Sequence, residues 1–211
     1  MRFFVSVGVP VWIKRAIYSV QCELLGKPLG DKTINGVAKA TSGGAKVTVV
    51  NNENIHITIK FLGEVDSKKI QKIEQQLRTV EYPAFNVAIE GIGAFPNKQH
   101  ARVIWARCKT QELVEFANEI NKALPEFPSE QFVGHITLAR IKKMDMKQFF
   151  EKYQKWKFGD FKVENFYLMA SELSPSGAKH HVIAEYKCQP KDYCHGSDLN
   201  LHKPKGELIM Y

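Results

Sequence analysis

Two copies of one short motif constrain this chain of 211 residues more than any other feature of its sequence. Each copy has His-Ile-Thr followed by an aliphatic residue, and the copies begin at His56 and at His135, 79 residues apart. This spacing is far longer than a hairpin would need. The repeat therefore predicts an internal duplication that gives two similar lobes.

Both copies lie in runs of β-branched and aliphatic residues, which favour strands. Because side chains alternate across a strand, His56 and Thr58 share one face, and His135 and Thr137 share the matching face of the second strand. A lone histidine in such a place is more often structural or simply solvated. The same polar face repeated on two otherwise apolar strands is hard to explain by packing, and it indicates a functional site.

The paired side chains suit acid–base chemistry at phosphorus. Imidazole titrates near neutral pH, so two histidines can serve as base and acid in one turnover, and the threonine hydroxyls can donate to phosphate oxygens between them. In-line displacement needs the entering and leaving oxygens on opposite sides, with the two rings roughly 6–8 Å apart across a cleft. No carboxylate cluster accompanies the motifs, so no metal is needed to explain the site.

The remaining segments predict an α+β fold rather than a doubly wound sheet. Strands are expected at 3–9, 46–50, 54–62, 85–95, 102–108, 132–141, 161–172 and 180–187, the last two as a hairpin. Helices are expected at 11–25, after a cap at Asp66 or Ser67, after a cap at Thr110, and at 145–153. The glycine-rich segment 26–45 predicts a long loop. Residues 188–211 lack periodicity, so we expect one domain over 1–187 and a C-terminal extension over 188–211.

The charge balance favours an anionic partner such as nucleic acid or a phosphorylated small molecule. The chain has 30 Lys and Arg against 22 Asp and Glu, for a net charge of +8. Eight of the basic residues lie between Arg140 and Lys162, with only three acidic ones among them. We expect this stretch to form a basic rim beside a phosphate-handling cleft, and a solvated helix face is the alternative.

No apolar run approaches the ~18–20 residues that a membrane span needs, and no small-residue cleavage site follows the apolar N-terminal run. We therefore expect a cytoplasmic protein. Four cysteines are too few and too scattered for a disulfide framework, and Cys22 and Cys108 should be buried thiols. A zinc cluster is disfavoured by the ligand spacing of the candidates Cys188, Cys194, His195 and His202.

Several other residues carry weaker signals. Histidines without a repeated context are expected at the surface or in the hairpin, namely His100, His180, His181, His195 and His202. For Phe95 and Trp105, burial within strands is a commoner use of an aromatic ring than stacking on a base. The chain has neither a dinucleotide fingerprint nor a P-loop ending, so ATP-driven ligation is poorly supported.

The two motifs resemble the paired His-x-Thr-x signatures of the 2H phosphoesterase superfamily. Within it, the sequence around the first motif resembles the RNA 2′,3′-cyclic phosphodiesterases, also called 2′-5′ RNA ligase-like proteins. Further matching segments are 54–65, 93–96, 103–105 and 134–140. The resemblance covers Arg2 to about Lys187. The loop at 26–45 is longer than is usual for the family, and the last 24 residues extend beyond its usual final strand.

This resemblance implies a bilobal α+β fold in which two antiparallel sheets flank a central cleft, with helices on the outside. It also implies hydrolysis of RNA 2′,3′-cyclic phosphate ends to 2′-phosphate ends, with no metal and no cofactor. By analogy, His56 donates a proton to the leaving 3′-oxygen, His135 is the base that activates water, and Thr58 and Thr137 hold the phosphate. The two near-equivalent strands do not by themselves assign the acid and the base.

Two further residues are candidates by resemblance or by position. Arg140 matches an arginine that approaches the phosphate in related enzymes. Strict alternation puts it on the opposite face from His135, so this role requires a twist or a bulge, and a surface ion pair is the alternative. Lys60 shares the face of His56 and Thr58 and is a candidate RNA contact, with a solvated lysine as the alternative.

The expected partner is RNA with 2′,3′-cyclic phosphate ends, tRNA-derived ends among them, bound by a monomer. Two alternatives stay open. The same histidines would also suit reversible 2′-5′ RNA ligation, or a phosphodiesterase acting on other 2′,5′-linked or small cyclic nucleotides. The other alternative is an RNA-binding module that holds a phosphate without turnover, although such a module would have little need of both histidines.

Overall fold

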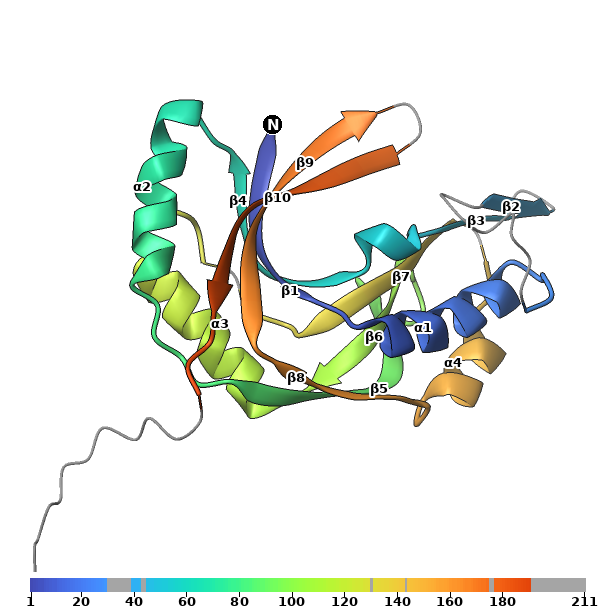
Figure 1. The fold of residues 1–211 in the computed structure, drawn as a ribbon. Helices are drawn as coiled ribbons and strands as arrows, with labels where there is room; N and C mark the ends of the chain where they lie inside the picture. Colours follow the sequence, from blue (N-terminus) through green and yellow to red (C-terminus); the bar gives the residue numbers. More distant parts are fainter. Residues whose placement is uncertain (30–38, 43–44, 130, 143, 175–176, 191–211) are drawn as a thin grey trace, which may run out of the picture.

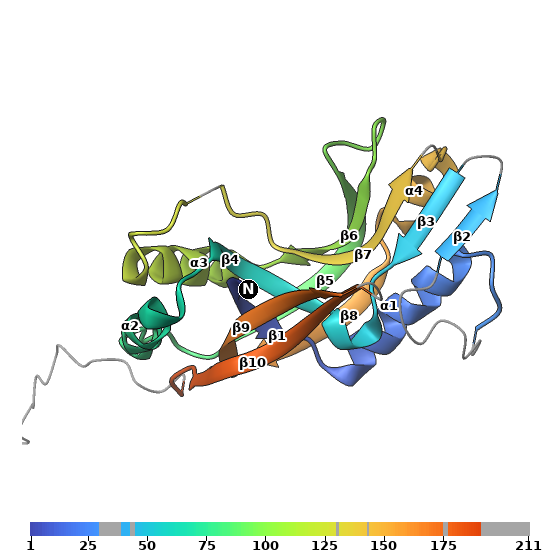
Figure 2. The same cartoon turned by 90° about the horizontal axis from the view of Figure 1, so that it is seen from above.

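The protein is described by a computed structural model over residues 1–29, 39–42, 45–129, 131–142, 144–174 and 177–190. In these ranges the chain forms two antiparallel sheets with four helices (Figure 1). In two perpendicular views, α2 and α3 lie at one end of the molecule and α1 and α4 at the other (Figure 1, Figure 2).

The first sheet has four strands in the order β10-β9-β1-β4. Their bounds are β1 Arg2–Gly8, β4 His56–Glu64, β9 Asn165–Ser174 and β10 Gly177–Lys187. Two helices pack against it, α2 over Ser67–Arg78 and α3 over Gln111–Ala123. We call this sheet, with α2 and α3, lobe 1. It carries the first motif, because β4 begins at His56.

The second sheet has six strands in the order β2-β3-β7-β6-β5-β8. Their bounds are β2 Lys39–Ser42, β3 Ala45–Val49, β5 Phe85–Phe95, β6 Val103–Lys109, β7 His135–Lys142 and β8 Lys157–Val163. The helices packed on it are α1 over Val11–Leu24 and α4 over Lys147–Tyr153. We call this sheet, with α1 and α4, lobe 2. It carries the second motif at the start of β7.

The two lobes exchange helices. Helix α1 follows β1 of lobe 1 but packs on β7 and β8 of lobe 2, whereas α3 follows β6 of lobe 2 and packs on β4 of lobe 1. In each lobe the motif strand is antiparallel to the strand that precedes the exchanged helix, which pairs β4 with β1 and β7 with β6. This correspondence confirms the predicted bilobal α+β fold.

Local sequence explains why the helices form where they do. In α2, the Asp66 side chain accepts a hydrogen bond from the Lys68 N–H, as a cap residue should, and Ile73 and Leu77 bury the apolar stripe. Thr110 occupies the cap position of α3 but makes no side-chain cap bond; its hydroxyl accepts from the Ala88 N–H and donates to the Lys109 carbonyl.

The structure corrects the sequence prediction in two places. Residues 39–42, which we expected to lie in a loop, form β2 and pair with β3. Pairing with β3 makes this short segment a strand, and the pattern of its own residues does not reveal that pairing. The predicted strand at 161–172 is divided at Glu164 into β8 and β9, which belong to different sheets. The apolar alternation changes phase there, because the polar residues Glu164 and Asn165 follow one another, and the sequence prediction did not use this signal.

Other expectations concern the cysteines and the ends of the chain. Cys22 and Cys108 are buried and free, as predicted. Beyond β10, Gln189 forms a bridge to Pro83, while Cys194, His195 and His202 lie outside the described residues. Part of the loop prediction, over 30–38, also lies outside them. None of the helices in the described ranges is long and apolar enough to cross a membrane.

Candidate active site

A β-bulge occupies the same place in both motif strands. Ile59 has no pairing partner on β1, and Leu138 has none on β6. Each bulge comes one residue after the motif threonine. Since an extra residue interrupts the alternation of side chains, the faces taken by the residues after the bulge are exchanged.

The bulges determine which residues after each motif lie on the same face of the strand as the histidine. Phe61 and Arg140 are turned to the face of the motif and are exposed there, whereas Lys60 and Ala139 are buried. The condition set for Arg140, a bulge in its strand, is therefore met. The same device in lobe 1 brings Phe61 to the motif face and removes Lys60 from it.

One cavity of about 470 Å³ opens between the motif strands. Its lining includes five of the six predicted site residues, namely His56, Thr58, His135, Thr137 and Arg140. Further lining comes from β1, β3 and the β9–β10 hairpin, which extends toward the top of Figure 1. The duplication therefore brings both motifs to a single site.

The His56 ring is held by two hydrogen bonds within its own strand region. Its Nδ1 lies 2.7 Å from the Asn54 carbonyl oxygen, which can only accept, so Nδ1 carries the proton. Its Nε2 lies 3.0 Å from Thr58 Oγ1, which donates to it. Burial lowers the pKa of His56 to about 4, helped by the nearby His180 and His135, whereas the bond to Asn54 acts in the opposite direction.

The His135 ring repeats the Nδ1 hydrogen bond of His56. Its Nδ1 lies 2.7 Å from the carbonyl oxygen of Val133, again two residues earlier in the chain. Burial lowers the pKa of His135, and the bond to Val133 partly opposes the effect. Both rings are therefore neutral at pH 7 in the free protein, with Nε2 unprotonated. A phosphate anion bound beside them would favour the protonated form of either ring.

A buried glutamine holds the bulge of lobe 2. The Leu138 carbonyl accepts one hydrogen bond from the Val50 N–H and one from Gln21 Nε2, each 2.9 Å long. Gln21 lies on α1 and is only 1% exposed, and the same Nε2 donates to the Val50 carbonyl. Helix α1 thus fixes the bulge that turns Arg140 into the cavity.

Lys60 has a structural role, and its predicted contact with RNA is wrong. It is 5% exposed, and its Nζ donates to Asn121 Oδ1 at 2.6 Å. Three more acceptors lie within 3.3 Å, all on the segment after α3, namely the carbonyls of Phe127 and Pro128 and Ser129 Oγ. The bulge at Ile59 is the physical reason, because it moves Lys60 to the buried face.

The sequence did not identify the aromatic rings around the two histidines. In lobe 1, the His56 ring centroid lies 4.9 Å from Phe4 and 5.2 Å from His180. His180 lines the cavity, so the expectation that it merely decorates the hairpin is wrong. Phe4 and Phe61 also line the cavity. If the bulge at Ile59 had been known, the strand alternation would have assigned Phe61 to the face of the motif. No local signal in the sequence marks His180.

In lobe 2, the ring centroids of Phe95 and Trp105 lie 5.1 Å and 6.0 Å from that of His135. Trp105 is 7% exposed, which confirms the expected use of this ring in packing. Neither of these two aromatic rings is titratable, so His135 has apolar neighbours where His56 has a second imidazole.

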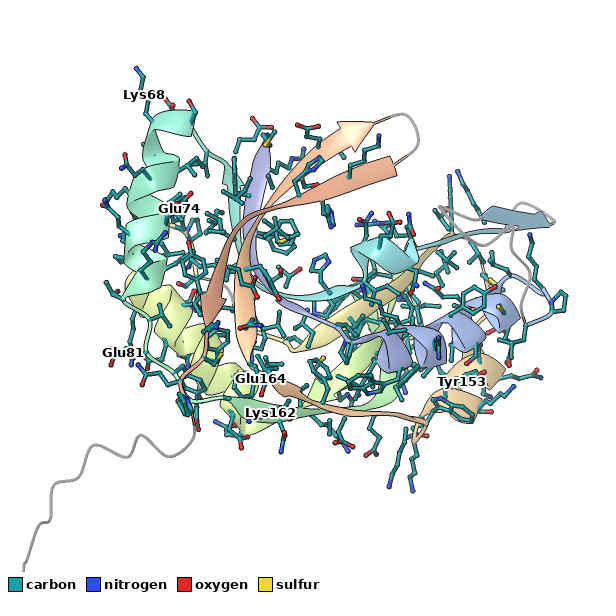
Figure 3. All side chains as sticks on the ribbon, viewed as in Figure 1. Lys68, Glu74, Glu81, Tyr153, Lys162 and Glu164 are labelled. Carbon is teal, nitrogen blue, oxygen red and sulfur yellow. The ribbon has the colours of Figure 1, made fainter. Side chains whose placement is uncertain are left out.

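The basic stretch does not surround the cavity. Of its basic residues that the structure describes, only Arg140 contributes to the lining. Lys152 pairs with Glu23, and Lys162 pairs with Glu164 at 3.3 Å. Figure 3 shows Lys162 and Glu164 at the edge of the molecule opposite the β9–β10 hairpin. The prediction of a basic rim beside the cavity is therefore wrong, since α4 and β8 carry Lys152 and Lys162 on the outer side of lobe 2.

Nowhere in the described part of the chain are three His, Cys, Asp or Glu side chains grouped as a metal site would need. The arrangement that is present, two neutral imidazoles, two hydroxyls and a guanidinium, suits the binding and protonation of phosphate oxygens.

Comparisons with known proteins show the family to which the chain belongs. Residues 30–105 match the family model described as LigT like Phosphoesterase. An RNA 2′,3′-cyclic phosphodiesterase of Archaeoglobus fulgidus is 34% identical over 183 residues, which cover 84% of this chain and 94% of the relative. One of Methanocaldococcus jannaschii is 32% identical over 193 residues, covering 88% of this chain and 100% of the relative.

Solved structures show the same fold. TT0787 of Thermus thermophilus matches with a TM-score of 0.68 and 24% identity, covering 90% of this chain and 100% of that one. E. coli LigT in its apo form matches with a TM-score of 0.64 and 20% identity, covering 89% of this chain and 96% of that one. These similarities extend over both lobes.

Proposed function

Because the chain belongs to the LigT-like phosphoesterases of the 2H superfamily, we propose that it hydrolyses 2′,3′-cyclic phosphate ends of RNA to 2′-phosphate ends. The relatives named RNA 2′,3′-cyclic phosphodiesterase support this substrate. The observation that carries the proposal is the cavity in which two histidines, one from each lobe and each held through Nδ1 by the carbonyl two residues earlier, meet two threonines and Arg140.

The contents of the two lobes support a division of labour between the histidines. Arg140, the cation that suits a phosphate, lies in lobe 2 beside His135, whereas exposed Phe61 in lobe 1 offers a stacking surface for a base. With the base stacked on Phe61, the ribose lies on the lobe 1 side of phosphorus, and we propose that its 3′-oxygen faces His56. In-line attack then brings water from the lobe 2 side, where His135 is the base.

The reaction follows from these positions. His135 Nε2 takes a proton from water as the water oxygen bonds to phosphorus. The bond from phosphorus to the 3′-oxygen breaks, and His56, protonated at Nε2 in the complex, gives its proton to that oxygen. Thr58, Thr137 and Arg140 hold the non-bridging oxygens, whose charge is stabilised in the transition state. The products are a 2′-phosphate and a free 3′-hydroxyl, and the mechanism uses no metal.

One assay tests the proposal. An oligonucleotide with a 2′,3′-cyclic phosphate end is incubated with the protein in EDTA, and the product is identified by chromatography against 2′- and 3′-phosphate standards. We expect a 2′-phosphate end. A strict requirement for added metal would contradict the metal-free mechanism. Cyclic ends left intact while 2′-5′ linkages are joined or opened would favour the ligase alternative, and tight binding without any product would favour the RNA-binding module.

A further inference from the structure

A third histidine faces the same cavity and takes no part in the mechanism above. His180 lies on β10 directly opposite Ser171 of β9, and both line the cavity. Its ring centroid is 5.2 Å from that of His56 and 5.1 Å from that of Phe4, edge-on to both rings. Among the described residues no hydrogen bond satisfies either of its ring nitrogens.

The distance between the two imidazoles allows them to share a ligand. An oxygen bonded to a ring nitrogen lies about 4 Å from the centre of that ring, given a hydrogen bond of about 3 Å. Spheres of this radius around the rings of His56 and His180 overlap, because their centres are only 5.2 Å apart. An oxygen held by His56, or a second oxygen of the same phosphate, therefore falls within reach of His180.

The charges around His180 favour its neutral form. Burial and the adjacent His181 lower the pKa of His180. His56 on β4 and Arg2 on β1 face the same cavity, whereas His181 lies 3.8 Å from the Glu172 carboxylate on β9. A neutral imidazole offers one N–H donor and one acceptor nitrogen, so His180 can donate to an oxygen without competing with His56 for the catalytic proton.

We propose that His180 is a third substrate-binding histidine, which donates an imidazole N–H to a ribose or phosphate oxygen of the RNA end held at His56. It supplies lobe 1 with the polar contact that Arg140 supplies to lobe 2, since the position equivalent to Arg140 in lobe 1 is the apolar Phe61. The inference rests on the proposed function for the identity of the ligand.

The test compares His180→Phe, which keeps a ring against Phe4 and His56, with His180→Asn, which keeps a donor. His181→Asn is the matched control, because His181 is the next residue of β10 and does not line the cavity. Binding of a nucleoside 2′-monophosphate is measured by calorimetry, and kcat and KM are measured on a cyclic-phosphate oligonucleotide. Thermal unfolding of each variant verifies that it folds.

We expect His180→Phe to weaken nucleotide binding about tenfold and to raise KM by a similar factor, the loss of one hydrogen bond to an anion, with a smaller change in kcat. His180→Asn should recover part of the loss, and His181→Asn should behave as wild type. Wild-type binding and KM in His180→Phe, or in His180→Leu if the first variant does not fold, would overturn the inference, because both variants lack the donor. If wild-type protein binds the nucleotide but leaves cyclic ends intact, the proposed function fails while the binding comparison still decides the role of His180.

Discussion

The motif strands of the two lobes share a sequence and a backbone but differ in what surrounds them. In β4 and in β7 the histidine is bonded through Nδ1 to the carbonyl two residues earlier, and a bulge follows the threonine. After the bulge, lobe 1 presents Phe61 to the cavity where lobe 2 presents Arg140. The lobes thus offer the same acid–base group, but the position after the bulge is apolar in lobe 1 and cationic in lobe 2.

This difference shows how a duplicated site handles an asymmetric substrate. A cyclic phosphate has a nucleoside on one side of phosphorus and an open path for water on the other. Two identical histidines would allow it to bind in either direction. Because Arg140 follows the bulge in lobe 2 and Phe61 follows it in lobe 1, we expect the substrate to bind in one direction and each histidine to take one task.

The largest expected effect comes from removing either shared group. His56→Ala and His135→Ala should each lower kcat on a cyclic-phosphate oligonucleotide by about 10³-fold, since general acid or base catalysis contributes about 10²–10⁴-fold. His100→Ala, which changes an exposed histidine outside the cavity, is the control. Full activity in either of the first two variants would disprove the two-histidine mechanism.

The next effect tests the cationic side of the comparison. Arg140→Gln should lower kcat/KM about 10²-fold, because hydrogen bonds to a charged group contribute about 1.5–3 kcal/mol and their contribution grows as charge develops. Lys142→Gln is the matched control, two residues later in β7 and outside the cavity lining. Equal activities of the two variants would show that the bulge does not bring Arg140 to the phosphate.

The apolar side should give a smaller and more selective effect. Phe61→Ala should raise KM for an oligonucleotide about tenfold, as expected when one base loses a stacking partner, and should leave the affinity for inorganic phosphate unchanged. Phe61→Tyr, which keeps the ring, should stay close to wild type. A loss of phosphate affinity in Phe61→Ala would mean that the two lobes are not divided in this way.

The sequence predicted the common part of the two strands but not their differences. Alternation in an apolar run placed His56, Thr58, His135 and Thr137 correctly, because a strand has a fixed period and the duplication repeats it. The bulges could not be located, since a register shift depends on the partner strand. For this reason the prediction for Lys60 was wrong, and that for Arg140 could only be made conditional.

Residues that reach the site through tertiary structure were also missed. His180 lies on the β9–β10 hairpin, more than 40 residues after the second motif. Gln21 lies on a helix that follows a strand of one lobe and packs on the other. The spacing of Gln21 from Ile13 and Ile17 places it on the apolar face of its helix but does not reveal its contact with β7, and no local pattern marks His180. The charge count led to the wrong surface, because α4 and β8 carry half of the basic residues of this stretch on the outer side of lobe 2.

The smallest expected effects concern the supports of the two bulged strands. The side-chain amide of Gln21 on α1 donates a hydrogen bond to the Leu138 carbonyl of β7. The side-chain amide of Asn121 on α3 accepts one from Lys60 of β4. Gln21→Leu and Lys60→Met should each lower the free energy of unfolding by about 1–3 kcal/mol, because buried polar partners are left unsatisfied. Only Gln21→Leu should also weaken phosphate binding, by a few-fold, since Arg140 follows the bulge that Gln21 holds. Urea denaturation and phosphate titration of both variants measure this, and equal phosphate affinities would contradict it.

The most direct test of the division of labour replaces the leaving 3′-oxygen of the cyclic phosphate by sulfur. A thiolate leaves without a proton, because a thiol has a pKa near 8.5 and an alcohol a far higher one, so the acid becomes unnecessary and the base does not. On this substrate, His56→Ala should recover to within about tenfold of wild-type kcat, the acid's share of the barrier having been removed, while His135→Ala should stay inactive. Equal inactivity of both variants, or rescue of His135→Ala alone, would contradict the assignment of the acid to lobe 1 and the base to lobe 2.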